Sequence, residues 1–182
     1  MAALVAGLLA QASDRTVLTS ALLATRHAGK AGVIAGLALA LALGNAVGAV
    51  GGWLVAPHLS PQAGDLLVAF ALLSAGGSAL WPIRRRALSG RYGGFVTALL
   101  AIGLLAIGDR TQFITAALAT RTPMPALAAI GATLGALAVN IPAVVLGEHR
   151  FRHLPLTAIR LGAASLLLIG GTLHALATLR LI

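Results

Sequence analysis

The chain has 182 residues, of which 59% are hydrophobic and only 9% are charged. A water-soluble core of this size does not require so much apolar surface, so the composition excludes a soluble globular protein and predicts an all-α polytopic membrane protein. A formal net charge of +9 would suit a protein that binds nucleic acid. In a membrane chain we interpret it as the positive charge of cytoplasmic loops, and we expect no nucleic-acid partner.

Six apolar segments follow one another along the chain, and they define the predicted transmembrane helices. Each is long enough, or nearly so, to cross about 30 Å of hydrocarbon. We therefore predict six transmembrane helices in a single domain over residues 1–182, with the lipid bilayer as the principal partner. The segments are residues 2–25, 31–56, 64–82, 93–119, 124–147 and 155–179.

Two thirteen-residue segments that lie 95 positions apart are nearly identical. Asp14–Arg26 and Asp109–Arg121 agree at eight of thirteen positions, and Asn45 and Asn140 are separated by the same 95 residues. The chain is therefore predicted to consist of two halves of three helices each. Because three is odd, the second half is expected to have inverted topology, which creates a pseudo-two-fold site near the bilayer centre. The predicted halves are residues 1–83 and 93–182.

Basic residues are concentrated in the loops after the first, third and fifth segments. These loops lie on one side of the predicted membrane, and by the positive-inside rule that side is the cytoplasm. Both termini are then outside the cytoplasm. The preference for arginine, together with abundant alanine and glycine, is compatible with a bacterial source, so we expect the bacterial inner membrane. The basic residues of the three loops are Arg26, Lys30, Arg84, Arg85, Arg86, Arg91, Arg150 and Arg152.

Each repeated segment places an aspartate near the middle of a membrane crossing. Insertion of a carboxylate there costs roughly 2.5 to 3.5 kcal/mol, so two matched carboxylates indicate function, and we predict Asp14 and Asp109 as metal ligands. Two carboxylates combined with neutral oxygens suit a hard divalent cation such as Mn²⁺ or Ca²⁺. The residues expected to line this site are Gln11, Thr16, Asn45, Thr111, Gln112 and Asn140.

Arg15 and Arg110 directly follow the two aspartates and are the charged neighbours of the predicted site. Each can extend toward the membrane surface, pair with a carboxylate of the other half, or line an exit path. If each aspartate is held in an ion pair, the charged cluster is purely structural. Asn45 and Asn140 also have a structural alternative to cation binding, which is to form hydrogen bonds between helices.

Gly108–Gln112, with Leu118 and Ala119 following, resembles the hallmark of the GDT1 family, also called UPF0016 or TMEM165-like proteins. That hallmark is Glu-x-Gly-Asp-Lys/Arg-Thr/Ser, once in each half. Residues 131–148 and 154–160 are similar to the family's fifth helix and the start of its sixth. The resemblance implies a six-helix transporter that moves Mn²⁺ or Ca²⁺ out of the cytoplasm in exchange for protons. The cation is then a substrate, and no resident cofactor is expected.

The hallmark is degenerate in this chain. Its glutamate is replaced by Gln11 in the first copy and by Ala106 in the second, and Ser13 replaces the first glycine. The four acidic ligands that the resemblance implies are therefore reduced to Asp14 and Asp109. A site with charge −2 can still hold a divalent cation, but it has less spare charge with which to bind protons.

These features favour a secondary transporter that exports a divalent cation, with Mn²⁺ ahead of Ca²⁺ and with proton coupling. The alternative is a non-transporting relative that acts as a membrane interaction or assembly protein, which the missing glutamates favour. We do not predict an enzyme, because an intramembrane aspartyl protease has Gly-x-Gly-Asp where this chain has Ala106–Asp109. Export of another solute and assembly into a homo-oligomer stay open.

Overall fold

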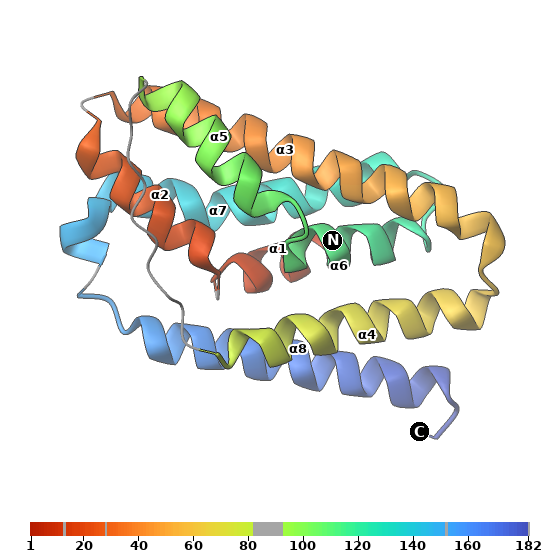
Figure 1. Cartoon of the computed structure of the whole chain (residues 1–182). Coiled ribbons are helices and arrows are strands. Elements are labelled where there is room, and N and C mark those ends of the chain that lie inside the picture. Colours follow the sequence, from red (N-terminus) through yellow and green to blue (C-terminus); the bar gives the residue numbers. More distant parts are fainter. Residues whose placement is uncertain (13, 28, 82–92, 152, 182) are drawn as a thin grey trace.

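The computed structural model describes the chain except for residues 13, 28, 82–92, 152 and 182. The described residues form helices joined by short loops, with no strand among them, which confirms the all-α prediction for this part of the chain (Figure 1). Five of the loop arginines used to predict orientation, at positions 84, 85, 86, 91 and 152, lie outside the described residues. The elements are α1 (Ala2–Ala12), α2 (Arg15–Arg26), α3 (Lys30–Val55), η1 (Ala56–His58), α4 (Pro61–Ala79), α5 (Gly94–Ala106), α6 (Arg110–Ala119), α7 (Pro125–Phe151) and α8 (Leu156–Thr178).

Three helices in the described part of the chain are long and apolar enough to cross a membrane. They are Lys30–His58, which combines α3 with η1, then α7 and α8. A fourth crossing is present if α5 and α6 are counted as one broken span. Length and composition therefore identify three to four candidate spans among the described residues, and they do not confirm the predicted number of six.

The difference arises partly because the first and fourth predicted segments are not continuous helices. Asp14 is the N-cap of α2 and accepts a hydrogen bond from the Thr16 backbone N–H at 3.1 Å. Asp109 is the N-cap of α6 and accepts one from the Thr111 N–H at 3.3 Å. An N-cap residue has a non-helical backbone and marks the start of a new helix, so the preceding helix cannot continue through it. The apolar runs 2–25 and 93–119 are therefore each divided at their aspartate.

The second of these breaks is also a sharp turn. The axes of α5 and α6 differ in direction by 64°. Gly108 lies at this turn with φ of 74°, a left-handed conformation that glycine adopts without steric cost. The break therefore sets Asp109 at the corner between two short helices, where its carboxylate can face a cavity.

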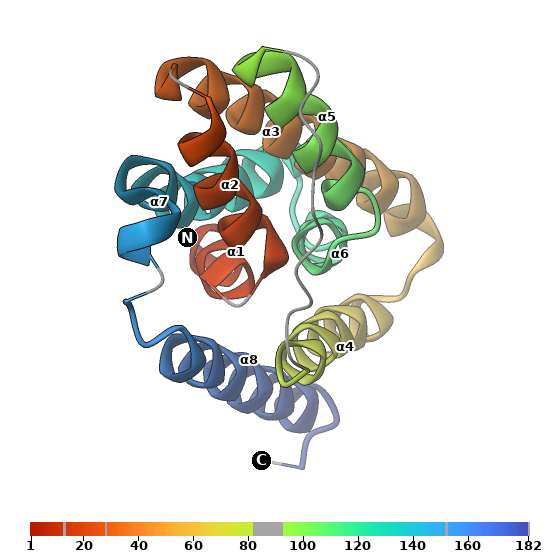
Figure 2. The same cartoon turned by 60° about the vertical axis from the view of Figure 1, so that its left-hand side comes forward.

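The helices pack in three pairings that join the two predicted halves. α3 runs along α5 and α6, α7 runs along α1 and α2, and α4 pairs with α8. Figure 2 shows α4 and α8 as one layer, α1 and α6 as a second layer, and α3 and α7 on the far side of them. Helices α1 and α6 thus lie between the α4–α8 layer and the long helices α3 and α7. Asp14 at the first break is buried, whereas Ile107 and Gly108 at the second break are exposed.

Close approach of these helices depends on small residues. A Cβ atom built on Gly52 of α3 would lie 2.1 Å from the Ala116 carbonyl oxygen of α6, and one on Gly135 of α7 would lie 2.2 Å from the Leu4 carbonyl oxygen of α1. Larger side chains would push the helices apart, as expected where backbones pack directly in a membrane. Outward-facing Trp53, Phe70 and other large apolar side chains are exposed, which suits contact with lipid.

Candidate cation site

The two breaks, the end of α5 and α4 line a partly open polar cavity of about 520 Å³. Both repeated aspartates line it, so residues 95 positions apart in sequence reach the same space. Its polar lining residues are Asp14, Arg15, Ser74, Ser78, Asp109 and Arg110, and its walls are completed by Leu104, Leu105, Ile107, Gly108 and Phe113.

Asp14 is almost completely buried, with 6% of its surface exposed. One carboxylate oxygen accepts hydrogen bonds from both the backbone N–H and the hydroxyl of Thr16. The other oxygen lies 3.5 Å from Nη2 of Arg110, which belongs to the second predicted half. The first aspartate is therefore fixed by its own helix on one side and paired with a guanidinium from the other half on the other side.

Asp109 accepts a hydrogen bond from a neutral amide, and the Arg110 charge also acts on it. Its Oδ2 accepts a hydrogen bond from the amide Nε2 of Gln11 at 3.3 Å, in addition to the cap from Thr111. Gln11 is fully buried, and its amide also donates to the Thr111 hydroxyl at 3.0 Å while its oxygen accepts from Asn140 at 3.0 Å. Gln11 thus supports Asp109 from behind and does not line the cavity.

Asn45 and Asn140 also lie behind the cavity, where they connect the long helices to the broken ones. Oδ1 of Asn140 on α7 lies 2.9 Å from the Ser20 hydroxyl of α2. Oδ1 of Asn45 on α3 lies 3.1 Å from the Thr115 hydroxyl of α6. Ser20 and Thr115 occupy the same position of the repeat, so each half supplies the asparagine that holds the other half's broken helix.

The remaining predicted lining residues stabilise the helix breaks. Gln112 accepts from the Gly108 N–H at 2.7 Å and donates to the Gly44 carbonyl at 3.2 Å, which ties the α5–α6 turn to α3. Thr16 and Thr111 are buried and contribute the capping contacts. Of the predicted residues, the cavity contacts only the two aspartates and the two arginines.

Two cavity residues, Ser74 and Ser78 of α4, were not predicted from the sequence. Their hydroxyls donate to the carbonyls of Ala71 and Ala75 at 3.0 Å each, so the oxygen lone pairs stay available to a ligand. The repeat could not reveal them, because the positions 95 residues later hold Ile169 and Leu173. Their spacing of four residues, which places both on one face of an apolar helix, was the signal that could have found them.

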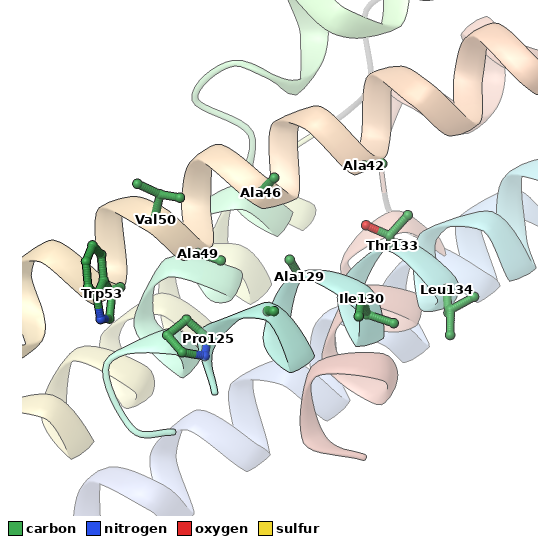
Figure 3. A pocket seen from close by; sticks show the side chains of 11 residues that line it. Ala42, Ala46, Ala49, Val50, Trp53, Pro125, Ala129, Ile130, Thr133 and Leu134 are labelled. Atoms are coloured by element: carbon green, nitrogen blue, oxygen red, sulfur yellow. The ribbon is translucent and has the colours of Figure 1, made fainter. Parts of the chain in front are cut away.

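A second cavity, of about 530 Å³, lies between α3 and α7 (Figure 3). Ala42, Ala46, Val50 and Trp53 of α3 face Ile130 and other α7 residues across it, and the Thr133 hydroxyl is its main polar group. That hydroxyl already accepts a hydrogen bond from Asn45 at 3.0 Å. An apolar groove of this kind offers no ligands for a cation, so the polar cavity is the candidate site.

The ligand chemistry of the polar cavity is restricted to oxygen. Within the described ranges, no group of three or more His, Cys, Asp or Glu side chains comes together. Two carboxylates and two hydroxyls are hard ligands, which select Mn²⁺, Ca²⁺ or Mg²⁺ over soft metals.

Comparison with known proteins agrees with this chemistry. The family described as "Divalent cation/proton antiporter GDT1" matches residues 1–87 and 94–180. A protein of Vibrio cholerae serotype O1, strain ATCC 39541, named "Putative manganese exporter", is 34% identical over 165 residues, which is 88% of this chain and 82% of that protein. No solved structure matches the chain with significant similarity. The chain therefore belongs to the GDT1 family of cation transporters and is an integral membrane protein.

Proposed function

We propose that the protein is a secondary transporter that exports Mn²⁺ across the bacterial inner membrane in exchange for protons, with Ca²⁺ as the second candidate substrate. The observation that carries this proposal is the meeting of Asp14 and Asp109 in one cavity at two helix breaks. The family supports a divalent cation and protons, and the name of the Vibrio cholerae relative favours manganese.

In this proposal the cation binds between the two aspartates. Asp14 and Asp109 balance its charge, and the hydroxyls of Ser74 and Ser78 replace part of its water shell. A water molecule occupies about 30 Å³ in the liquid, so a cavity of about 520 Å³ has room for a cation that keeps several waters. Partial hydration suits an ion that must be released again.

We further propose six crossings in two inverted halves, 1–83 and 93–182, with both termini outside the cytoplasm. Counting α1 with α2 and α5 with α6 as two broken crossings gives the number six. The reciprocal packing of α3 on α5 and α6, and of α7 on α1 and α2, supports two related halves. Rocking of one half against the other would open the cavity to each side in turn, as in other transporters built around discontinuous helices.

The alternative is a relative that keeps the fold but no longer transports. The observation in its favour is that both carboxylates already have partners, because Asp14 pairs with Arg110 and Asp109 accepts from Gln11. The double substitution Gln11→Glu with Ala106→Glu restores the family's glutamates. Transport that appears only in this variant would favour the alternative, whereas transport by the unaltered chain would exclude it.

The proposal is tested with purified protein in lipid vesicles. Uptake of Mn²⁺, Ca²⁺ and Mg²⁺ is measured with and without a proton gradient, for the unaltered chain and for Asp14→Asn and Asp109→Asn. Asp65→Asn is the matched control, because Asp65 lies outside the cavity in a partly exposed ion pair with Arg121. We expect gradient-dependent Mn²⁺ flux that both cavity variants abolish and the control retains. Equal flux in all four proteins would contradict the proposal.

A further inference from the structure

We propose that Arg110 is a tethered counter-cation of Asp14, which a divalent cation must displace in order to bind. This inference rests on the proposed function and assigns a specific role to the arginine of the second repeated segment. The guanidinium would neutralise Asp14 on the carrier that returns without metal, and the incoming cation would take its place.

The first observation is the ion pair itself. Nη2 of Arg110 lies 3.5 Å from Oδ1 of Asp14, and the two side chains are only 14% and 6% exposed. Arg110 begins α6, whereas Asp14 caps α2, so the pair joins the two broken helices. Both residues line the cavity, so the arginine lies beside a carboxylate that the cation itself requires.

The second observation is that the two halves differ at this point. Arg110 forms its ion pair with Asp14, whereas Asp109, which also lies in the field of Arg110, accepts a hydrogen bond from the neutral amide of Gln11. Arg15, which corresponds to Arg110 in the first repeated segment, is exposed. Its charge is therefore screened by solvent far more than that of Arg110, which makes Arg110 the stronger competitor for a cation in the cavity.

The charge balance of the cavity gives the reason for displacement. The two aspartates and two arginines that line it carry formal charges of −2 and +2, which sum to zero. An arginine side chain keeps its charge at physiological pH, so this balance changes only if a guanidinium moves. Withdrawal of Arg110 from Asp14 would expose a negative site to the cation, and its return would favour release.

This role also accounts for a site with only one carboxylate in each half. With both hallmark glutamates replaced, fewer groups can accept protons on the return step. A guanidinium that pairs with Asp14 supplies the compensating charge from within the chain. The long, flexible arginine side chain and the cavity of about 520 Å³ give it room to move without a rearrangement of the helices.

The test measures equilibrium binding of Mn²⁺ to the full-length protein in detergent, for the unaltered chain, Arg110→Gln, Arg110→Met and Arg110→Lys. Removal of a unit charge from about 4 Å corresponds to tenfold or more in affinity at the effective dielectric of a protein site. We expect the Gln and Met variants to bind Mn²⁺ at least about tenfold more tightly and to release it more slowly. The Lys variant, which keeps the charge, should bind like the unaltered chain.

Arg15→Gln is the matched control, because it removes the corresponding but exposed charge, and it should change the affinity less than Arg110→Gln. If Gln at position 110 impairs folding, the Met variant, which keeps the length of the apolar stem, decides the outcome. Unchanged or weaker Mn²⁺ binding in the folded neutral variant would overturn the inference. Failure of the proposed function is distinguishable, because Asp14→Asn and Asp109→Asn would then bind Mn²⁺ as well as the unaltered chain does.

Discussion

The amide of Gln11 donates a hydrogen bond to the carboxylate of Asp109 across 3.3 Å, at a position where the family hallmark has a glutamate. A glutamate in this place would face Asp109 with a second negative charge, whereas the amide stabilises it. Because the same glutamine also contacts Thr111 and Asn140, the replacement is integrated into a buried network. The cavity is therefore less acidic than a hallmark with both glutamates would make it.

We expect Gln11→Glu to strengthen cation binding. The substitution adds a carboxylate next to Asp109, and a second negative charge at this distance should tighten Mn²⁺ binding about tenfold or more. The affinity is measured by isothermal titration with Mn²⁺. Gln62→Glu adds the same charge at an exposed position of α4 and should leave the affinity unchanged. Weaker binding in the Gln11 variant would show that the amide network, and not the charge, controls the site.

A second prediction concerns the hydrogen bond between Ser20 and Asn140. Ser20→Ala leaves Oδ1 of Asn140 without this contact, which should lower the free energy of unfolding by about 1 kcal/mol. Asn140→Ala also removes the hydrogen bond to Gln11 and should cost more. Thermal unfolding in detergent is measured for Ser20→Ala, Asn140→Ala and the double variant. Because the two residues touch, the double variant should lose less than the sum of the single losses. Strictly additive losses would contradict a direct contact.

A third prediction compares two adjacent glycines of α3. Gly52→Ala places a Cβ 2.1 Å from the Ala116 carbonyl oxygen, whereas a Cβ on Gly51 meets no atom within 4 Å. The first substitution should destabilise the protein by about 1 to 3 kcal/mol because α3 must move away from α6. The second should be neutral or slightly stabilising, since alanine favours the helix. Equal melting temperatures for the two variants would contradict the close packing of these helices.

The sequence singled out the two aspartates that line the polar cavity, but not the residues around them. Asp14 and Asp109 were found because a repeated charge in apolar sequence has few explanations, and both line the cavity. The breaks were not predicted, because an apolar run is interpreted as one helix unless its N-cap is recognised. An aspartate two residues before a threonine was such a signal, since aspartate is among the preferred N-cap residues.

The roles of the residues around the two aspartates could not be assigned from spacing alone. The repeat relates Asn45 to Asn140, but whether an amide faces a cavity or a neighbouring helix depends on the direction of packing. Ser74 and Ser78 have no counterpart in the second half, so an argument from symmetry could not include them. Only the packing of α4 beside the two breaks places the two serines in the same cavity as the carboxylates.

We propose that Asp14 and Asp109 together hold the transported cation, and the position of a bound Mn²⁺ ion would show whether they do. Crystals of the protein grown with Mn²⁺ would be measured at the manganese absorption edge, where the anomalous signal identifies the metal. We expect one peak in the polar cavity, within coordination distance of both carboxylates, that is lost in Asp14→Asn. A peak that contacts neither aspartate, or that persists unchanged in this variant, would contradict it.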